Sequence, residues 1–384
     1  MACSMITYIR KKLLKMEEMF MKRKLEEVQF ARAFAMFSVL FVHFSSTGLG
    51  ATEVESNMFY VYSSFNTIGK LGVPVFFFLS GLVLLYSYRN KVFNAETIKA
   101  FYIKRLKYII IPYITISLLY FIGKWMMYYD YTAIEAIKTF VQQLFTGKVY
   151  MHLYFMFVLI QFYIVFPLIL FIFKKFNLKV LPAFIGSLII QFAWYYLNKS
   201  YFGVTSRGSY FITYFSFFVT GAAIGFHYMR LDEYWNRSKK WISFFIVAAF
   251  LISAVTLIIA DITTKTNTLS NWLPPSDYRT LILDGFYTAL GLTGGLMCIW
   301  LGKMVLSLNN LKLSHFLNQL AAMSFGIYLF HPYFLIYARL LLPGGSPVVF
   351  HSWQLITAIV VTAISWIITH FVSKNKYGWL LIGK

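Results

Sequence analysis

The chain alternates long apolar runs with short polar connections. Ten of these runs carry few charged side chains, and each approaches the length of about 20 residues that a helix needs to cross a bilayer. Strands of a membrane β-barrel would instead alternate apolar and polar residues over segments of about ten. The pattern therefore predicts an all-α, polytopic membrane protein with about ten transmembrane helices. They are expected at residues 31–48, 69–87, 108–126, 153–173, 180–197, 210–228, 241–260, 281–302, 320–340 and 353–373.

Composition agrees with a membrane protein. Of the 384 residues 59% are hydrophobic and only 13% are charged, whereas about 25% are charged in typical soluble domains. Cys3 and Cys298 are the two cysteines, which excludes a disulfide framework and a cysteine metal cluster. We therefore expect no metal site.

Three segments are predicted: a basic N-terminal segment (1–30), a membrane domain (31–373) and a tail (374–384). The first is amphipathic but has neither an apolar core nor a small-residue cleavage site, so we expect no cleaved signal peptide. Its basic character fits a cytoplasmic location.

The basic residues predict the orientation of the chain. Of 35 Lys and Arg residues, 25 lie in the termini and the even-numbered connections, seven lie in the odd-numbered connections, and Arg32, Lys124 and Arg339 lie in or at the ends of the apolar runs. By the positive-inside rule both termini are cytoplasmic. The formal net charge of +21 also favours contact with anionic membrane lipids. Nucleic acid is not an expected partner, because no soluble domain is present to bind it.

The first apolar run, RAFAMFSVLFVH, begins with Arg32 and ends with His43. Eleven helical residues advance about three turns, so both side chains share one face about 16 Å apart. Arg32 could be an interfacial residue that helps to set orientation, and His43 a hydrogen-bonded buried histidine. Because ionisable groups are costly to bury in a membrane, they are also candidates for catalysis. Histidine can act as a general base near neutral pH.

Two further stretches are unusual for membrane helices. The second run contains Ser80 and Gly81; glycine permits close helix packing, and the serine hydroxyl can bond a carbonyl or a substrate. The third run is preceded by Lys104, Arg105 and Lys107. This basic cluster is typical of a topology anchor, and it could also hold the phosphates of a soluble donor.

Other polar candidates lie in or near later runs. In YLFHPYF, Pro332 frees a backbone carbonyl at about Ile327 and predicts an irregular helix around His331. His152 precedes the fourth run, and Asp284 lies just inside the eighth. Each is a candidate for substrate binding or for oxyanion stabilisation.

Four of these stretches occur in the order found in the acyltransferase-3 family of bacterial membrane acyltransferases, which the chain resembles from about residue 26 to its C-terminus. They are the first run with its Arg and His, FFFLSG, KRLKYIIIPY and YLFHPYF. One departure concerns the basic motif, where the family often has arginine and this chain has Tyr108. The terminal YGWLLIGK and the stretch around His152 look similar to a branch associated with surface polysaccharide modification, which includes proteins proposed to help produce poly-N-acetylglucosamine.

The resemblance implies transfer of an acyl group, usually acetyl from cytoplasmic acetyl-CoA, to a hydroxyl of a cell-surface or exported glycan or a lipid-linked sugar. By position, Arg32 and His43 match the family's essential pair, Ser80 and Gly81 its second-span motif, and Arg105 its basic motif. Acyl-CoA is then a donor substrate and no bound cofactor is expected. The expected location is the bacterial plasma membrane.

Within this interpretation several roles stay open. His43 is either a general base or a transient acyl carrier, and Ser80 and His331 are candidate oxyanion donors. Some members of the family carry an extracytoplasmic hydrolase-like domain that has no counterpart in this sequence. Transfer to the acceptor would then use the membrane domain alone or a separate polysaccharide-synthesis protein. The sequence does not distinguish acetyl from succinyl, and it identifies neither the acceptor sugar nor the oligomeric state.

A second class of function is compatible with the same residues. A polysaccharide exporter or flippase could line its path with Arg32, His43 and His331. The ten runs do not divide into two matching halves, as those of many transporters do, and this favours the acyltransferase.

Overall fold

The computed structural model describes residues 25–128, 130–267, 276–344 and 346–383, and this part of the chain is helical without any strand. The all-α prediction is confirmed. Most of the predicted N-terminal segment lies outside the described residues. The first helices are α2 (Glu26–Ala51), α3 (Asn57–Gly69), α4 (Gly72–Tyr88), α5 (Ala95–Arg105), the π-helix η1 (Leu106–Ile110), α6 (Ile111–Tyr128), α7 (Ala133–Leu144) and α8 (Tyr154–Phe176).

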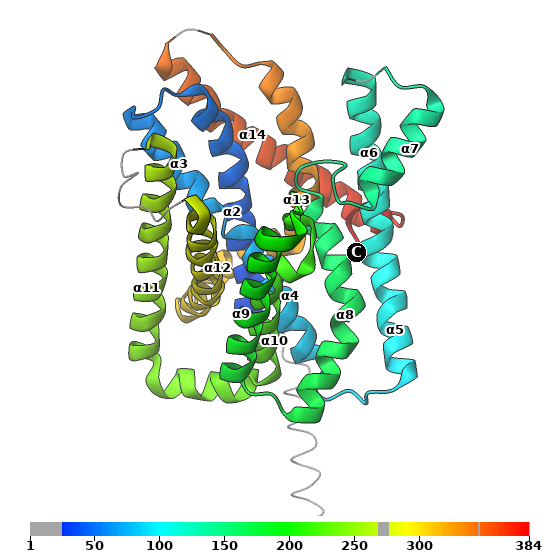
Figure 1. Cartoon of the computed structure of the whole chain (residues 1–384), viewed down its shortest axis with the longest axis vertical. Helices are drawn as coiled ribbons and strands as arrows, with labels where there is room; N and C mark the ends of the chain where they lie inside the picture. The colour runs from blue at the N-terminus through cyan, green and yellow to red at the C-terminus, as the bar shows by residue number, and fades with distance from the viewer. Residues whose placement is uncertain (1–24, 129, 268–275, 345, 384) are drawn as a thin grey trace, which may run out of the picture.

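The second half of the chain continues the bundle (Figure 1). Its elements are α9 (Val180–Leu197), η2 (Asn198–Phe202), η3 (Arg207–Ser209), η4 (Phe211–Tyr214), α10 (Phe215–Phe226), α11 (Tyr228–Thr266), α12 (Ser276–Ser307), α13 (Leu311–Leu340), α14 (Pro347–Lys374) and α15 (Trp379–Ile382).

Nine helical segments among the described residues are long and apolar enough to cross a membrane. They cover nine of the ten predicted spans. The exception is the run predicted at 210–228, which forms the shorter apolar segment Phe211–Phe226. Its α10 part is almost wholly buried, so this element is surrounded by protein. The nine spanning segments are Glu26–Ala51, Asn57–Tyr88, Ala95–Met127, Tyr154–Phe176, Val180–Phe202, Tyr228–Thr266, Tyr278–Ser307, Leu311–Leu340 and Pro347–Lys374.

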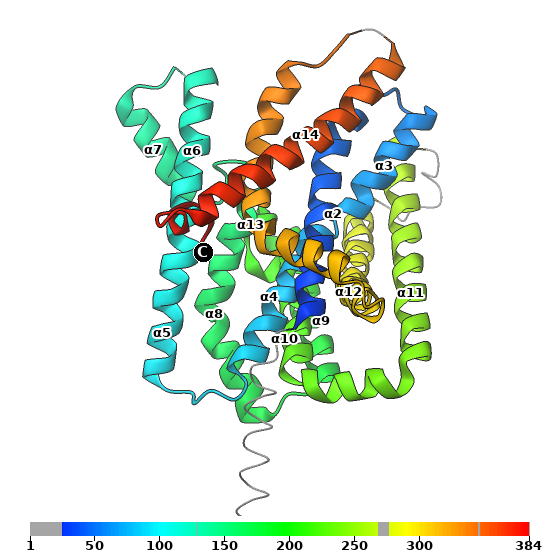
Figure 2. The same cartoon turned by 180° about the vertical axis from the view of Figure 1, so that it is seen from behind.

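Helices α2, α4 and α10 lie inside the bundle, with α11 on one flank and α5, α6 and α7 on the other (Figures 1 and 2). Helix α2 packs against α3, α4, α12 and α13. The face of α2 that carries Arg32 and His43 therefore lies among other helices. Its Arg32 and His43 are both partly buried.

The contact between α4 and α10 depends on glycine. A Cβ at Gly81 would lie 2.0 Å from the Phe218 carbonyl oxygen, and a Cβ at Gly221 would lie 1.9 Å from the Phe78 carbonyl oxygen. Side chains at these positions would collide with backbone, so the two helices approach more closely than larger residues allow. The prediction that Gly81 permits close helix packing is confirmed.

Two helices are irregular at positions that matter for the sites below. A π-helical turn, η1, joins α5 to α6 immediately after Arg105. Pro112 follows it, and proline cannot donate the backbone hydrogen bond of a regular helix. In α11, Ser238 has non-helical torsion angles, and the first part of α11 runs across the end of the bundle before the helix turns along its flank (Figure 1).

Several connections lie at one or the other end of the molecule. The α4–α5 and α8–α9 connections and the first part of α11 lie at one end, and the α2–α3, α6–α7 and α13–α14 connections lie at the other (Figure 1). The first group contains Arg89, Lys91 and Lys179 together with the basic part of α11. These three basic segments therefore share one end, called the basic end below.

Candidate active site

Three histidines from distant parts of the chain meet inside the bundle. The ring centroids of His43 on α2 and His331 on α13 are 5.0 Å apart. His152, in the turn before α8, has its ring centroid 6.3 Å from that of His331. All three were candidates from sequence, and the fold brings them into one cluster. We call these residues the histidine cluster.

His331 is held in one tautomer by its own helix. Its side chain is fully buried, and its Nδ1 lies 2.9 Å from the Ile327 carbonyl oxygen. A carbonyl can only accept, so Nδ1 carries the proton and, in the neutral ring, Nε2 presents a lone pair. That Nε2 is buried without a hydrogen-bond partner among the described residues.

His152 lies in an aromatic shell. Its ring contacts those of Tyr120, Tyr150 and Tyr328, with centroid distances of 5.0, 5.6 and 5.3 Å. The Tyr328 hydroxyl donates to the His152 backbone carbonyl. The Leu329 carbonyl lies nearby, but neither ring nitrogen of His152 makes a well-formed hydrogen bond in the described part of the chain. This buried ring therefore has unused hydrogen-bonding capacity.

A cavity of about 220 Å³ adjoins the cluster and is lined by both His43 and His152. Polar groups at its wall are Lys70, Tyr154, Tyr287 and Tyr328. A second pocket of about 340 Å³ shares Met151 and Tyr154 with it, and so lies next to it. We call the second pocket the vestibule; its other lining residues are Gly147, Lys148, Tyr150, Ser206, Gly208, Ser209 and Tyr214.

Arg339 brings a positive charge to the cluster. From the last turn of α13 its Nη2 donates to the His43 carbonyl oxygen at 3.2 Å, and its Nε donates to Thr47 Oγ1 at 2.9 Å. The sequence analysis placed Arg339 at the end of an apolar run without giving it a role. Among the basic residues, only Arg32, Lys124 and Arg339 lie in or at the ends of the apolar runs. That unusual position was the sequence feature that could have identified Arg339.

Lys70 is held in the cavity wall by a partly buried acid. Its Nζ lies 3.1 Å from Asp261 Oδ1, and Asp261 also accepts from Thr67 at 2.6 Å and from Lys265 at 2.6 Å. These bonds tie the turn between α3 and α4 to α11. The sequence analysis assigned no role to Lys70.

Arg32 lies near Arg105 and Tyr163 at the other end of the shared α2 face. The Arg105 guanidinium stacks 4.9 Å from the Tyr163 ring centroid, and Tyr163 interacts electrostatically with both arginines. Arg32 donates to Gln29 at 3.3 Å, while Arg105 Nε is buried without a partner. In the described residues neither arginine pairs with a carboxylate. Two such neighbours form a site for an anion.

The three predicted basic residues before the third run differ in environment. Arg105 turns inward and lines a cavity of about 250 Å³ with Tyr163. The Lys107 ammonium lies 4.9 Å from the Trp379 ring centroid of α15, and Lys104 is exposed. The π-helical turn after Arg105 changes the register of the helix at this point, as π-turns often do near functional sites.

Ser80 and Asp284 lie near the cavity without lining it. Ser80 follows Val73, which does line it, by seven residues, about 10 Å along the same face of α4. The Asp284 carboxylate binds Arg207 through two bonds of 2.6 and 2.7 Å. Among the described residues no group of three or more His, Cys, Asp or Glu side chains could hold a metal ion.

A buried histidine cluster at one end of a transmembrane helix and a paired arginine site at the other define a polytopic membrane protein with a polar interior. The family model described as an acyltransferase domain matches residues 25–370. The chain belongs to this acyltransferase-3 family.

Curated relatives include proteins of Staphylococcus aureus strains MSSA476, MRSA252 and Mu50, each described as a probable poly-beta-1,6-N-acetyl-D-glucosamine export protein. Each is 24% identical over 321 residues, which cover 81% of this chain and 83% of the relative. No solved structure gives a significant match.

Proposed function

We propose that this protein transfers an acyl group, acetyl in the first instance, from cytoplasmic acyl-CoA to a hydroxyl of a cell-surface or exported glycan or a lipid-linked sugar. The observation that carries the proposal is the arrangement on α2. Arg32 joins an arginine pair that has no carboxylate partner among the described residues, and His43 joins a cluster of buried imidazoles about three helical turns away.

The donor binds at the arginine pair. Arg32 and Arg105 present guanidinium groups that match phosphate oxygens in pairs, and Lys104 and Lys107 add positive charge outside them. The expected orientation places this end at the cytoplasm, where acyl-CoA is available. The acyl arm then points along the α2 face past Ser80 toward the histidine cluster.

Transfer takes place at the histidine cluster. The acceptor hydroxyl gives its proton to the lone pair of His43, and its oxygen attacks the thioester carbonyl. A C–O bond forms, the C–S bond breaks, and the CoA thiolate leaves and takes up a proton. The His331 ring packs against the His43 ring, with their centroids 5.0 Å apart, and restricts its orientation. Positioned general bases contribute about 10²–10⁴-fold in rate.

Charge on the tetrahedral oxyanion needs hydrogen-bond donors. Lys70 lines the cavity and Arg339 lies against His43, so both are candidate donors in addition to those from the sequence. Of the candidates from the sequence, His331 donates from Nε2 only once its ring is protonated, and Ser80 does not line the cavity. Each fixed donor of this kind raises the catalytic rate by about 10²–10³-fold. A transient acyl group on His43 is the alternative route, and an acyl-histidine adduct in quenched reactions would identify it.

The acceptor enters through the vestibule. Tyr150, Tyr154 and Tyr214 supply aromatic faces there, and Ser206 and Ser209 supply hydroxyls, a combination suited to a sugar. The vestibule opens beside the cavity that His43 lines. A separate extracytoplasmic or polysaccharide-synthesis protein would deliver the glycan to this opening.

The test uses purified protein in liposomes with labelled acetyl-CoA and a β-1,6-linked N-acetylglucosamine oligomer. We expect His43→Ala to lower transfer by about 10²-fold or more, while His370→Ala, which alters an exposed histidine, leaves it unchanged. Correct folding is checked by thermal unfolding in detergent. Undiminished transfer by a folded His43→Ala protein would remove His43 from the reaction.

A second candidate is glycan export, which the descriptions of the relatives favour. The same liposomes distinguish it. Movement of the oligomer across the bilayer without acyl-CoA, with no labelled product, would support the exporter and contradict the acyltransferase.

A further inference from the structure

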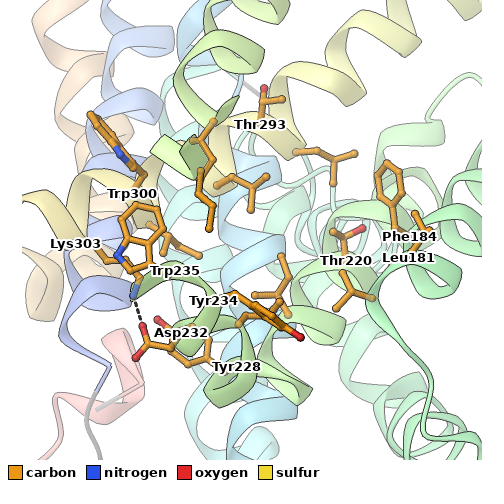
Figure 3. Close-up of a pocket in the computed structure, with 18 of the residues that line it drawn as sticks. Leu181, Phe184, Thr220, Tyr228, Asp232, Tyr234, Trp235, Thr293, Trp300 and Lys303 are labelled. Atoms are coloured by element: carbon orange, nitrogen blue, oxygen red, sulfur yellow. Dashed lines mark hydrogen bonds and ion pairs between the residues drawn. The ribbon is translucent and has the colours of Figure 1, made fainter. Parts of the chain in front are cut away.

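A large cavity lies away from the histidine cluster, between α9, α10, α11 and α12 (Figure 3). Its volume is about 680 Å³, within the range of about 300–1,000 Å³ typical of ligand pockets. None of its lining residues lines the histidine cavity or the vestibule. The proposed acyl transfer therefore gives it no role.

The cavity is long and apolar. On α12 its wall runs from Ala289 through Leu292, Leu296 and Ile299 to Lys303. These positions follow one face of the helix over 14 residues, or about 21 Å. One leaflet of a bilayer core is about 15 Å thick, half of the 30 Å core. The cavity is therefore long enough for an extended acyl chain.

Polar groups gather at one end of this cavity. Lys303 pairs with Asp232 on the first part of α11, and its ammonium lies 5.3 Å from the Trp235 ring centroid. Figure 3 shows this pair beside Trp300 and Tyr228. Aromatic rings and charged groups next to an apolar chain site reproduce the composition of a membrane interface.

Two buried polar atoms in the cavity wall lack partners. The indole Nε1 of Trp300 and the hydroxyl of Thr220 make no hydrogen bond in the described part of the chain. Burial of such atoms is costly. An indole N–H can only donate, so the cavity offers a donor for an ester or phosphate oxygen.

The polar end of the cavity lies at the basic end of the bundle. Around the bend of α11, Arg230, Arg237, Lys239 and Lys240 are exposed on the same short segment. One exposed acid, Glu233, accompanies them, so the segment is strongly positive. Basic clusters near an anionic membrane surface attract lipid headgroups, and each Lys or Arg contributes about 1 kcal/mol of binding free energy.

The cavity also opens at the surface of the bundle. Its rim includes Leu181, which is 65% exposed, and Tyr234, which is 48% exposed. A chain can therefore enter sideways from the surrounding lipid. We propose that this cavity binds one anionic phospholipid, with an acyl chain between α9 and α12 and the phosphate beside the basic bend of α11.

Native mass spectrometry of the full chain, titrated with phosphatidylglycerol or phosphatidylethanolamine in detergent, tests the proposal. We expect one phosphatidylglycerol to bind with at least about tenfold preference over phosphatidylethanolamine. Leu296→Trp fills the middle of the cavity and should weaken this binding by about tenfold or more. Ile252→Trp places the same bulk on an exposed face of α11 and should not change it.

A second variant separates binding from folding. Trp300→Phe removes the unpaired N–H and keeps an aromatic ring, so it should weaken phosphatidylglycerol binding by about fivefold to tenfold, the contribution of one hydrogen bond. Equal binding by wild type, Leu296→Trp and Trp300→Phe would overturn the proposal. Retention of a polyprenyl phosphate in place of phosphatidylglycerol would also overturn the proposal. Native mass spectrometry distinguishes the two lipids by the mass of the complex.

Discussion

Two residues on one face of α2 connect the two polar sites of this protein. Arg32 joins Arg105, and His43 joins His331 and His152. Both groups combine side chains that are costly to bury in a membrane. Arg105 stacks on the Tyr163 ring and His331 bonds a backbone carbonyl, and in the described part of the chain no carboxylate pairs with either.

Arg105 should be the principal phosphate ligand of its cluster, because it alone of the three predicted basic residues lines the cavity beside Tyr163. We expect Arg105→Ala to raise the KM for acyl-CoA by about 10- to 100-fold, the equivalent of a charged hydrogen bond worth about 1.5–3 kcal/mol. Lys104→Ala, which alters an exposed side chain, is the control and should change KM less than about threefold. Initial rates over a range of acetyl-CoA concentrations measure both. An equal effect of the two substitutions would show that Arg105 acts only as general positive charge.

At the scale of elements, the close contact of α4 with α10 fixes the centre of the bundle. Gly81, Gly221 and Gly225 allow backbone to meet backbone there. This contact holds α4 in place, and α4 carries Val73 into the histidine cavity.

Gly81→Ala should destabilise the protein, because its Cβ would overlap the Phe218 carbonyl. Overpacking of this kind costs about 1–3 kcal/mol. Gly186→Ala is the matched control, since nothing lies within 4 Å of its Cβ position, and it should be neutral or slightly stabilising. Thermal unfolding in detergent compares the two. Equal stability of both variants would mean that α4 and α10 separate without cost.

At the scale of the whole molecule, the basic α4–α5 and α8–α9 connections and the basic first part of α11 collect at one end (Figure 1). The charge distribution predicts that the basic end faces the cytoplasm. Under the proposed function, this orientation turns the first turns of α2, which carry Arg32, toward the side where acyl-CoA is made.

Cysteine labelling in intact cells checks the orientation, after Cys3 and Cys298 are replaced by serine and alanine. Glu53→Cys, at the opposite end from the basic connections, should react with a membrane-impermeant maleimide. Lys239→Cys, in the basic bend of α11, should react only after permeabilisation, although both positions are exposed. The reverse pattern would contradict the proposed donor side.

Much of the site was predictable from residue types. His43, His152 and His331 were candidates because imidazoles in apolar runs are rare and costly. Arg339 and Lys70 received no role, because a basic residue at the end of a span is ordinarily an interfacial anchor. Their contacts with the His43 backbone and with the cavity wall depend on where α13 and the α3–α4 turn meet α2.

The sequence by itself determined the helical class, nine spanning segments and the positions of the costly residues, because length, apolarity and charge act locally along the chain. It also placed Arg32 and His43 on one face, because helical periodicity is local. Only the tertiary structure decided that positions 43, 152 and 331 form one cluster, that Arg32 meets Arg105, and that the predicted sixth span is a short buried element. Those outcomes depend on which helices pack together, and side-chain packing between distant segments has no signature in the spacing of one chain.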